Sequence, residues 1–299
     1  MTPLDARWGY ATTPGFDGWD PARVAGELHG LGYRWIEWTP DFCGIDGDAD
    51  RKIPGLVSAS RNAGLEISQL MAMTDYVSGD DAQRRTRIDA TCRIIDAAAG
   101  SGVNLVSVYA GPDSWDPSAP RLFQDLGAAD AWSRVFAALD VIVERAEQRG
   151  IAVTFKPCVG TVAYDHYSSV SVLARYRGRT GFSINYDPSH FALAGNDVPW
   201  TIGQFGAAIR HVQLKDVFGI PGIEGRHFNF PMLGDGIVDW GSFFAALADV
   251  SYNGPLIALF ETFALYRGLL ASDPVAAARA TMDRLRLIER RVANAWAAP

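Results

Sequence analysis

The chain has 299 residues, of which 48% are hydrophobic and 20% are charged, and its formal net charge at pH 7 is −7. This composition is typical of a folded globular protein and excludes a disordered chain. The negative net charge argues against nucleic acid or an anionic membrane as the main partner, although it is compatible with a local basic pocket. A chain of this length is compatible with two domains, but α/β barrels often reach this size as one domain.

No stretch of the sequence predicts a membrane span or a secretory leader. The opening MTPLDARWGY has no apolar core, and no apolar run approaches the ~20 residues that a transmembrane helix needs. Cys43, Cys92 and Cys158 have no metal-like spacing, and such an odd, sparse set is typical of a reducing compartment. We therefore expect a cytoplasmic protein with buried or incidental thiols.

Short apolar runs rich in β-branched and aromatic residues predict eight strands. The runs are residues 6–12, 33–39, 65–73, 104–111, 151–157, 182–188, 211–217 and 255–262. The stretches between them carry apolar residues at helical spacing, as Trp132, Phe136 and Leu139 do. Glycine often separates a helical stretch from the next strand, as a helix C-cap does.

Eight successive strand–helix units predict a single (β/α)8 TIM barrel that forms one domain over residues 1–299. The active site of such a barrel lies at the C-terminal ends of its strands. A doubly wound open sheet is the alternative, but no G-x-G-x-x-G motif follows the first strand.

Polar side chains stand at the ends of the predicted strands. Because side chains alternate between the faces of a strand, the last inward positions are Lys156, Asp187, Gln213 and Glu261. Each of them alone is compatible with a solvated rim group. Four such residues at matching depth favour a site, because charges are seldom buried unless they are paired.

Four further residues are candidates for the same site. Glu37, on the second strand, is flanked by aromatic residues and suits hydroxyl binding, with a structural role as the alternative. His190 follows the aspartate by three residues and is expected to point back to the barrel mouth, or else to cap a loop. His211 and Lys215 share the face of the glutamine on the seventh strand.

The segments INYDPSHFALAG (184–195), RHVQLKDVFG (210–219), PMLGDGIVDW (231–240) and LIALFET (256–262) carry a family signal. They resemble the xylose-isomerase-like barrel superfamily of sugar isomerases, sugar epimerases and inosose dehydratases. In the first half the resemblance depends on strand order and on WIEW at 35–38. It is therefore specific from about residue 150 onward and indicates a family better than a substrate.

The resemblance implies a divalent cation held by Glu, Asp, His and Glu at the ends of strands five to eight. The equivalent residues here are Lys156, Asp187, Gln213 and Glu261, so two of the usual ligands are replaced. His190 keeps the D-x-x-H pattern of the family.

These departures argue against a metal. A lysine ammonium repels a cation, by ~4 kcal/mol for two unit charges ~4 Å apart at an effective dielectric constant near 20. A carboxamide is also a weaker transition-metal ligand than imidazole. We predict that the ammonium of Lys156 takes the place of the metal, paired with Asp187 and Glu261, and that no cofactor is needed. The ligands of any bound Mn²⁺ or Mg²⁺ would be Asp187, Glu261 and Gln213.

We predict an isomerase or epimerase that removes a proton next to a carbonyl of a sugar or polyol-like substrate. Glu261 is the expected base, Lys156 stabilises the enolate oxygen, and Asp187 and His190 complete the catalytic set. The predicted substrate-binding residues are Glu37, His211, Gln213 and Lys215.

Other functions stay open. Elimination begins with the same proton abstraction, so a lyase of the dehydratase or C-glycoside-cleaving type is the first alternative. A catalytically inactive sugar-binding protein is the second, because two metal ligands are replaced. A Schiff base on Lys156 ranks lower, since nearby carboxylates favour the charged lysine. The identity of the substrate and its phosphorylation are left open, and the resemblance allows a homo-oligomer.

A long loop, residues 218–240, follows the seventh strand. With His227, Phe228 and Phe230 it is expected to close over a ligand as a lid. A mobile connection or an oligomer contact is the alternative reading. The loop is no phosphate-binding P-loop, since it lacks the G-K-[ST] ending.

Overall fold

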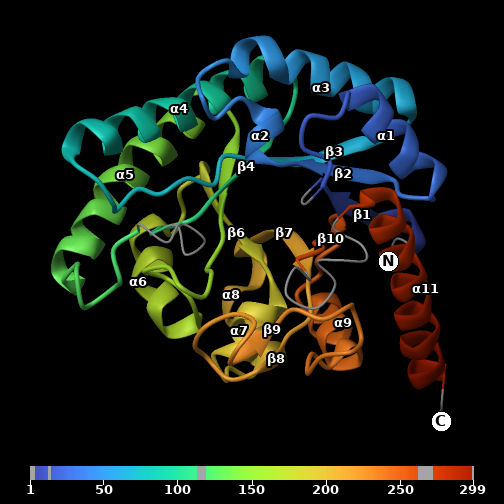
Figure 1. Ribbon diagram of the computed structural model, residues 1–299. Helices are drawn as coiled ribbons and strands as arrows, with labels where there is room; N and C mark the ends of the chain where they lie inside the picture. Colours follow the sequence, from blue (N-terminus) through green and yellow to red (C-terminus); the bar gives the residue numbers. More distant parts are fainter. Residues whose placement is uncertain (1–3, 13–14, 113–118, 262–271, 298–299) are drawn as a thin grey trace. The chain divides into compact units, whose positions relative to one another are not determined.

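A computed structural model describes residues 4–12, 15–112, 119–261 and 272–297 (Figure 1). The barrel strands of this described chain are β1 (Trp8–Ala11), β2 (Trp35–Trp38), β3 (Glu66–Met71), β4 (Leu105–Val108), β5 (Ala152–Phe155), β6 (Phe182–Tyr186), β7 (Ile209–Leu214) and β10 (Leu256–Ala258). Seven of these strands lie inside a predicted run, and β7 begins two residues before the predicted 211–217. The last predicted strand residue, Thr262, lies outside the described residues.

Helices alternate with these strands. They are α1 (Pro21–Gly30), α2 (Pro40–Cys43), α3 (Ala49–Ala63), α4 (Asp81–Gly100), α5 (Ala128–Gln148), α6 (His166–Tyr176), α7 (Pro188–Leu193), α8 (Val198–Phe205), α9 (Trp240–Asp249) and α11 (Pro274–Ala297). Short 3₁₀ turns precede β1 and β7, at Leu4–Arg7 and Gly206–Ala208. No helix in the described part of the chain is both long and apolar enough to cross a bilayer.

The strands form a closed barrel in the order β1, β10, β7, β6, β5, β4, β3, β2, with parallel pairing. This confirms the predicted (β/α)8 TIM barrel and excludes the doubly wound alternative. In such a barrel the C-terminal strand ends and the loops that follow them form the face that carries chemistry.

The described residues fall into two compact units, within Met1–Glu37, Ser58–Ser68 and Tyr186–Pro299 for the first and within Trp38–Val57 and Gln69–Asn185 for the second. One domain over residues 1–299 stays a prediction, as do the oligomeric state and the cytoplasmic location.

In the first unit, β1 lies between β10 and β2, and β10 pairs with β7. The approach of these strands is close at Gly9, where a Cβ atom would lie 2.7 Å from Cβ of Trp35 and would overlap the side chain of Ile257. Glycine therefore suits this position. The register sets Glu37 beside Ala11 and Gln213 beside Ile257, so both polar residues belong to strands that enclose the unit's apolar core.

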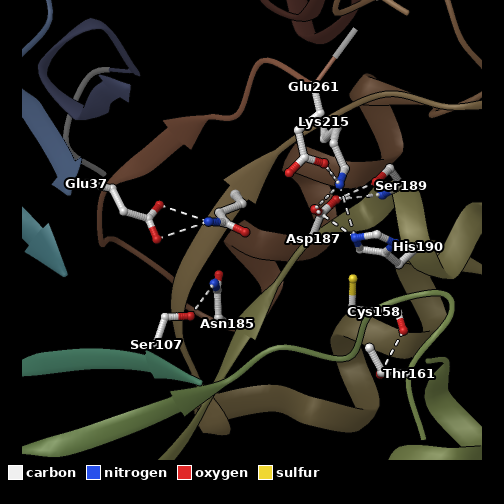
Figure 2. A network of polar contacts seen from close by, with 11 residues as sticks. Glu37, Ser107, Cys158, Thr161, Asn185, Asp187, Ser189, His190, Lys215 and Glu261 are labelled. Atoms are coloured by element: carbon white, nitrogen blue, oxygen red, sulfur yellow. Dashed lines mark hydrogen bonds and ion pairs between the residues drawn. The ribbon is translucent and has the colours of Figure 1, made fainter. Parts of the chain in front are cut away.

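The second unit contains β4, β5 and residues 69–71 of β3, with α4 and α5 lying side by side (Figure 1). Its interior includes paired polar groups as well as apolar side chains. Thr154 donates to Oε1 of Gln69 at 2.6 Å, and Asn185 donates to Oγ of Ser107 at 3.2 Å (Figure 2). These hydrogen bonds satisfy polar groups that would otherwise be costly to bury.

Asp216 anchors the loop that follows β7. Its carboxylate is fully buried and accepts five hydrogen bonds of 2.9–3.2 Å. The donors are the backbone N–H groups of Val217, Gly234, Gly236 and Val238 and the indole N–H of Trp240. Because one carboxylate satisfies five donors, it fixes the end of the loop to the start of α9.

Replacing this carboxylate should destabilise the fold. In Asp216→Asn an NH₂ group faces backbone donors, so we expect the free energy of unfolding to fall by about 2–4 kcal/mol. Urea unfolding followed by circular dichroism measures this change. The exposed Asp249 provides the control, and Asp249→Asn should change stability by less than about 0.5 kcal/mol. Equal effects of the two substitutions would contradict the anchoring role.

Candidate active site

The first unit brings together polar side chains from four strand ends. Glu37 lies on β2, Asp187 directly follows β6, Lys215 directly follows β7, and Glu261 lies beyond the end of β10. His190 comes from the short helix α7, whose N-cap is Asp187. The side chains of Glu37, Asp187, His190 and Lys215 are buried, so Asp187 is no solvated rim group, and Glu261 is partly buried.

The ammonium of Lys215 lies at the centre of one cluster. Its Nζ is 2.6 Å from Oε2 of Glu261, 3.3 Å from Oδ2 of Asp187 and 3.1 Å from Nε2 of His190 (Figure 2). The ring centroid of Phe230 lies 4.1 Å from the same nitrogen, which is a cation–π contact. Two carboxylates and an aromatic face all favour the charged form of this lysine.

Hydrogen bonds determine the protonation state of His190 and the orientation of the Asp187 carboxylate. An ammonium group only donates, so His190 accepts at Nε2 and carries its proton on Nδ1 as a neutral imidazole. Oδ1 of Asp187 accepts from the backbone N–H and the hydroxyl of Ser189, at 3.1 and 2.7 Å. This capping contact leaves Oδ2 of Asp187 facing the ammonium.

A second cluster joins Glu37 to Gln213 of β7. The side-chain Nε2 of Gln213 donates to both carboxylate oxygens of Glu37, at 3.0 and 2.9 Å (Figure 2). Both side chains are fully buried. Gln213 therefore binds a carboxylate through its NH₂ group.

His211 lies two residues before Gln213, on the same face of β7. Its Nε2 is 3.1 Å from Oγ of Ser68 and 4.0 Å from Oε2 of Glu37. The hydroxyl of Ser68 donates its hydrogen to the carbonyl of Ile36, so Nε2 of His211 is the donor toward Ser68. His211 thus presents an N–H group on the side of the Glu37 carboxylate.

Lys156 lies in the second unit, immediately after β5. It is 2% exposed, so it is no solvated rim group, and its backbone N–H donates to Val108 at 2.8 Å. The following residues form a tight turn in which the hydroxyl of Thr161 donates to the carbonyl of Cys158 (Figure 2). The pairing of Lys156 with Asp187 and Glu261 stays a prediction.

The structure thus assembles Asp187, His190, Lys215 and Glu261 in one cluster and Glu37, His211 and Gln213 in another. The ammonium that contacts the two acids in the first unit is that of Lys215, which had been assigned to substrate binding. Because Lys215 lies two residues after Gln213, strand alternation already predicted that the two side chains point to the same side. Ser189 and Phe230 were not predicted as neighbours of this cluster. The aspartate of D-P-S-H, followed by proline at the first helical position, was the available signal for a capping contact.

The predicted lid, residues 218–240, contains a short antiparallel hairpin, β8 (Phe218–Gly219) and β9 (Phe228–Asn229). Phe228 and Phe230 are buried, and Phe230 faces the Lys215 ammonium. His227 is exposed and accepts from the backbone N–H of Ile223, so it closes the hairpin turn. A lid movement stays a prediction.

Comparison with known proteins assigns the family. The family described as xylose isomerase-like TIM barrel matches residues 26–288, and the chain belongs to it. A ketose 3-epimerase of Arthrobacter globiformis is 25% identical over 262 residues, which are 78% of this chain and 83% of the epimerase. An inosose dehydratase of Lacticaseibacillus casei is 23% identical over 141 residues, 43% of this chain and 46% of the dehydratase.

Solved structures share the fold at low sequence identity. A 3-keto-D-glucoside 4-epimerase from E. coli, in apo form, has a TM-score of 0.72 at 15% identity, covering 94% of this chain and 99% of that one. The IolI protein with a bound zinc atom has a TM-score of 0.70 at 15% identity, covering 94% and 99%. The relatives that match in sequence are a sugar epimerase and a dehydratase, consistent with an enzyme.

The cluster around Lys215 does not fit a divalent cation. Among the described residues, no group of three or more His, Cys, Asp and Glu side chains is arranged to hold one. Asp187 and Glu261 instead face an ammonium group 3.3 and 2.6 Å away. A cation between these acids would meet the charge of Lys215 at close range, a repulsion of at least about 4 kcal/mol at an effective dielectric constant of 20.

A double-mutant cycle tests the pairing at this cluster. We expect Lys215→Met to lower the free energy of unfolding by about 3–5 kcal/mol, because it leaves two buried carboxylates without their counter-charge. Adding Glu261→Gln should recover part of that loss, with a coupling energy above about 1 kcal/mol. The ion pair of Arg284 with Asp235, 2.6 Å apart but solvent-accessible, is the control and should couple by less than about 1 kcal/mol. Equal coupling in the two pairs would contradict the account.

Proposed function

We propose that this chain is an isomerase or epimerase that removes a proton next to a carbonyl of a ketose or related polyol-like substrate. The observation that carries the proposal is the Lys215 ammonium, held 2.6 Å from Glu261 in a largely buried site. The match to a ketose 3-epimerase over 78% of the chain supports the substrate class. A cation beside a carboxylate base is what enolate chemistry needs.

The ammonium stabilises the oxygen on which charge develops. When the carbonyl oxygen of the substrate lies against Nζ of Lys215, proton removal places negative charge next to a fixed positive one. Asp187, His190 and Glu261 hold the ammonium in place before the reaction, so little reorganisation is required. This role does not depend on a metal, and we propose that the enzyme is metal-independent.

Glu261 is the proposed base. Its carboxylate takes the proton from the carbon next to the carbonyl, the C–H electron pair forms the C=C bond of the enolate, and the C=O electron pair moves to oxygen. Return of a proton to the opposite face of the same carbon gives the epimer. Return to the former carbonyl carbon, with transfer of the hydroxyl proton, gives the isomer. Neutral His190, whose Nε2 lies 3.4 Å from Oδ2 of Asp187, is the proposed group that relays a proton to and from that acid.

A lyase is the second candidate, favoured by the match to inosose dehydratase. The enolate forms in the same way and then expels a hydroxyl group from the β carbon. The C–O bond breaks with its electron pair, the leaving hydroxide takes a proton from a neighbouring acid, and water is released. Product analysis separates this outcome from epimerisation.

Lys156 is a second buried ammonium group, and its proposed role is still to stabilise the enolate oxygen. The sequence favoured it as the metal substitute, and its burial is compatible with a site residue. Two other lysines, Lys52 and Lys215, complete the lysine content of the chain. Substitution of each lysine by methionine therefore compares all three ammonium groups within one protein.

The proposal predicts exchange of a carbon-bound proton with solvent. We expect wild-type protein in D₂O to introduce deuterium next to the carbonyl of at least one ketohexose among D-fructose, D-psicose, D-tagatose and L-sorbose, as followed by NMR. Lys215→Met should lower this rate by about 10²–10³-fold, because the group that stabilises the oxyanion is lost. The Lys52→Met control, at a partly exposed lysine, should stay within about twofold of wild type.

Two results would contradict this proposal. An unchanged exchange rate in Lys215→Met would remove the ammonium from the mechanism. Saturable ketohexose binding without any exchange would favour the inactive sugar-binding protein. A loss of at least tenfold in Lys156→Met would support the role proposed for that lysine.

A further inference from the structure

The side-chain amide of Gln213 has one engaged end and one open end. Its Nε2 donates to both oxygens of Glu37, whereas its Oε1 is buried and accepts no hydrogen bond from any residue that the structure describes. Buried carbonyl oxygens are rarely left in that state, because burying an acceptor without a donor is costly. The open end therefore suits a hydrogen-bond donor.

Glu37 determines which end of the amide is open. An ionised carboxylate has acceptors only, so a rotated amide would set Oε1 of Gln213 against two oxygens. The contacts with Glu37 thus exclude the alternative orientation, and Gln213 can offer a ligand an acceptor only. His211 does not stabilise the rotated amide of Gln213, since Nε2 of His211 donates to Ser68.

The two polar groups of β7 have opposite hydrogen-bonding character. Gln213 and Lys215 share one face of the chain and are about 7 Å apart along it, since the strand rises ~3.3 Å per residue. Lys215 offers N–H donors and lies beyond the strand end, whereas Gln213 offers an acceptor and lies within the strand, one layer deeper. A ligand that extends along β7 meets a donor first and an acceptor below it.

We propose that Oε1 of Gln213 binds a free hydroxyl group of the substrate, and that Glu37 is the positioning residue that fixes this preference. This inference rests on the proposed function, which sets the carbonyl at Lys215. The substrate class is then a polyhydroxy ketone with an unsubstituted hydroxyl that reaches one layer deeper than the carbonyl. An ether, phosphate or second carbonyl oxygen at that point would meet another acceptor.

Replacing hydroxyl by fluorine tests this preference, because fluorine does not donate a hydrogen bond. The parent sugar is the one of the four ketohexoses that exchanges fastest. Calorimetric titration would compare its binding with that of analogues in which one hydroxyl at a time is replaced by hydrogen or by fluorine. We expect both analogues at one position to bind wild type at least tenfold more weakly than the parent sugar, a difference of about 1.4 kcal/mol. Analogues at the remaining positions should not show the same dependence on Gln213 and Glu37.

Two variants identify the residues responsible. In Glu37→Gln the partner has both donor and acceptor groups, so Gln213 can turn, and the hydroxyl-to-fluorine penalty should fall below about threefold. In Gln213→Met the same position should show no penalty, because the acceptor is lost. Glu66→Gln, at an exposed glutamate of β3, is the matched control and should keep the full penalty.

The outcomes separate this inference from the proposed function. Deuterium exchange with no analogue penalty, or with a penalty that persists in both Glu37→Gln and Gln213→Met, overturns the hydroxyl site while the enolate chemistry stands. If no ketohexose exchanges or binds, the proposed function fails and the assignment of Gln213 fails with it. A penalty lost in both variants and kept in Glu66→Gln supports the inference.

Discussion

An ammonium group buried between two acids constrains the rest of the first unit. Removing a charge from water costs several kcal/mol, and the cost is offset only by close, well-oriented partners. Lys215 has such partners in Glu261, Asp187 and His190, and the ring of Phe230 makes a cation–π contact with it. The arrangement gives the site a fixed positive charge that belongs to the chain itself.

Several local features serve this arrangement. The cap of α7 engages one oxygen of Asp187 and so directs the other to the ammonium. The five hydrogen bonds to Asp216 hold the end of the loop that supplies Phe230. The pair of Glu37 with Gln213 occupies the next layer along β7. In the proposed site Lys215, directly after β7, is the hydrogen-bond donor and Gln213, on β7, is the acceptor. A hydroxy ketone requires both groups.

The barrel could be predicted from the sequence because its signals are local. Strand-like runs, helical spacing and strand alternation gave the strand positions and the inward direction of Glu37, Asp187 and Gln213. Pairing between side chains was harder to predict. Lys156 and Lys215 both follow inward strand positions, and sequence alone cannot say which ammonium reaches a given acid. Phe230 was predicted to lie over a ligand, but its contact with Lys215 could not be predicted, since it depends on the path of a long loop fixed by Asp216.

The claim that the Lys215 ammonium, and no metal ion, balances Asp187 and Glu261 can be tested by locating ions directly. Crystals of wild type and of Lys215→Ala, soaked in MnCl₂, would be measured by anomalous X-ray diffraction. The account predicts no manganese peak between Asp187 and Glu261 in wild type and a new peak there once the ammonium is removed. A peak in wild type within about 2.5 Å of both carboxylates, at usual metal–oxygen distances, would contradict it.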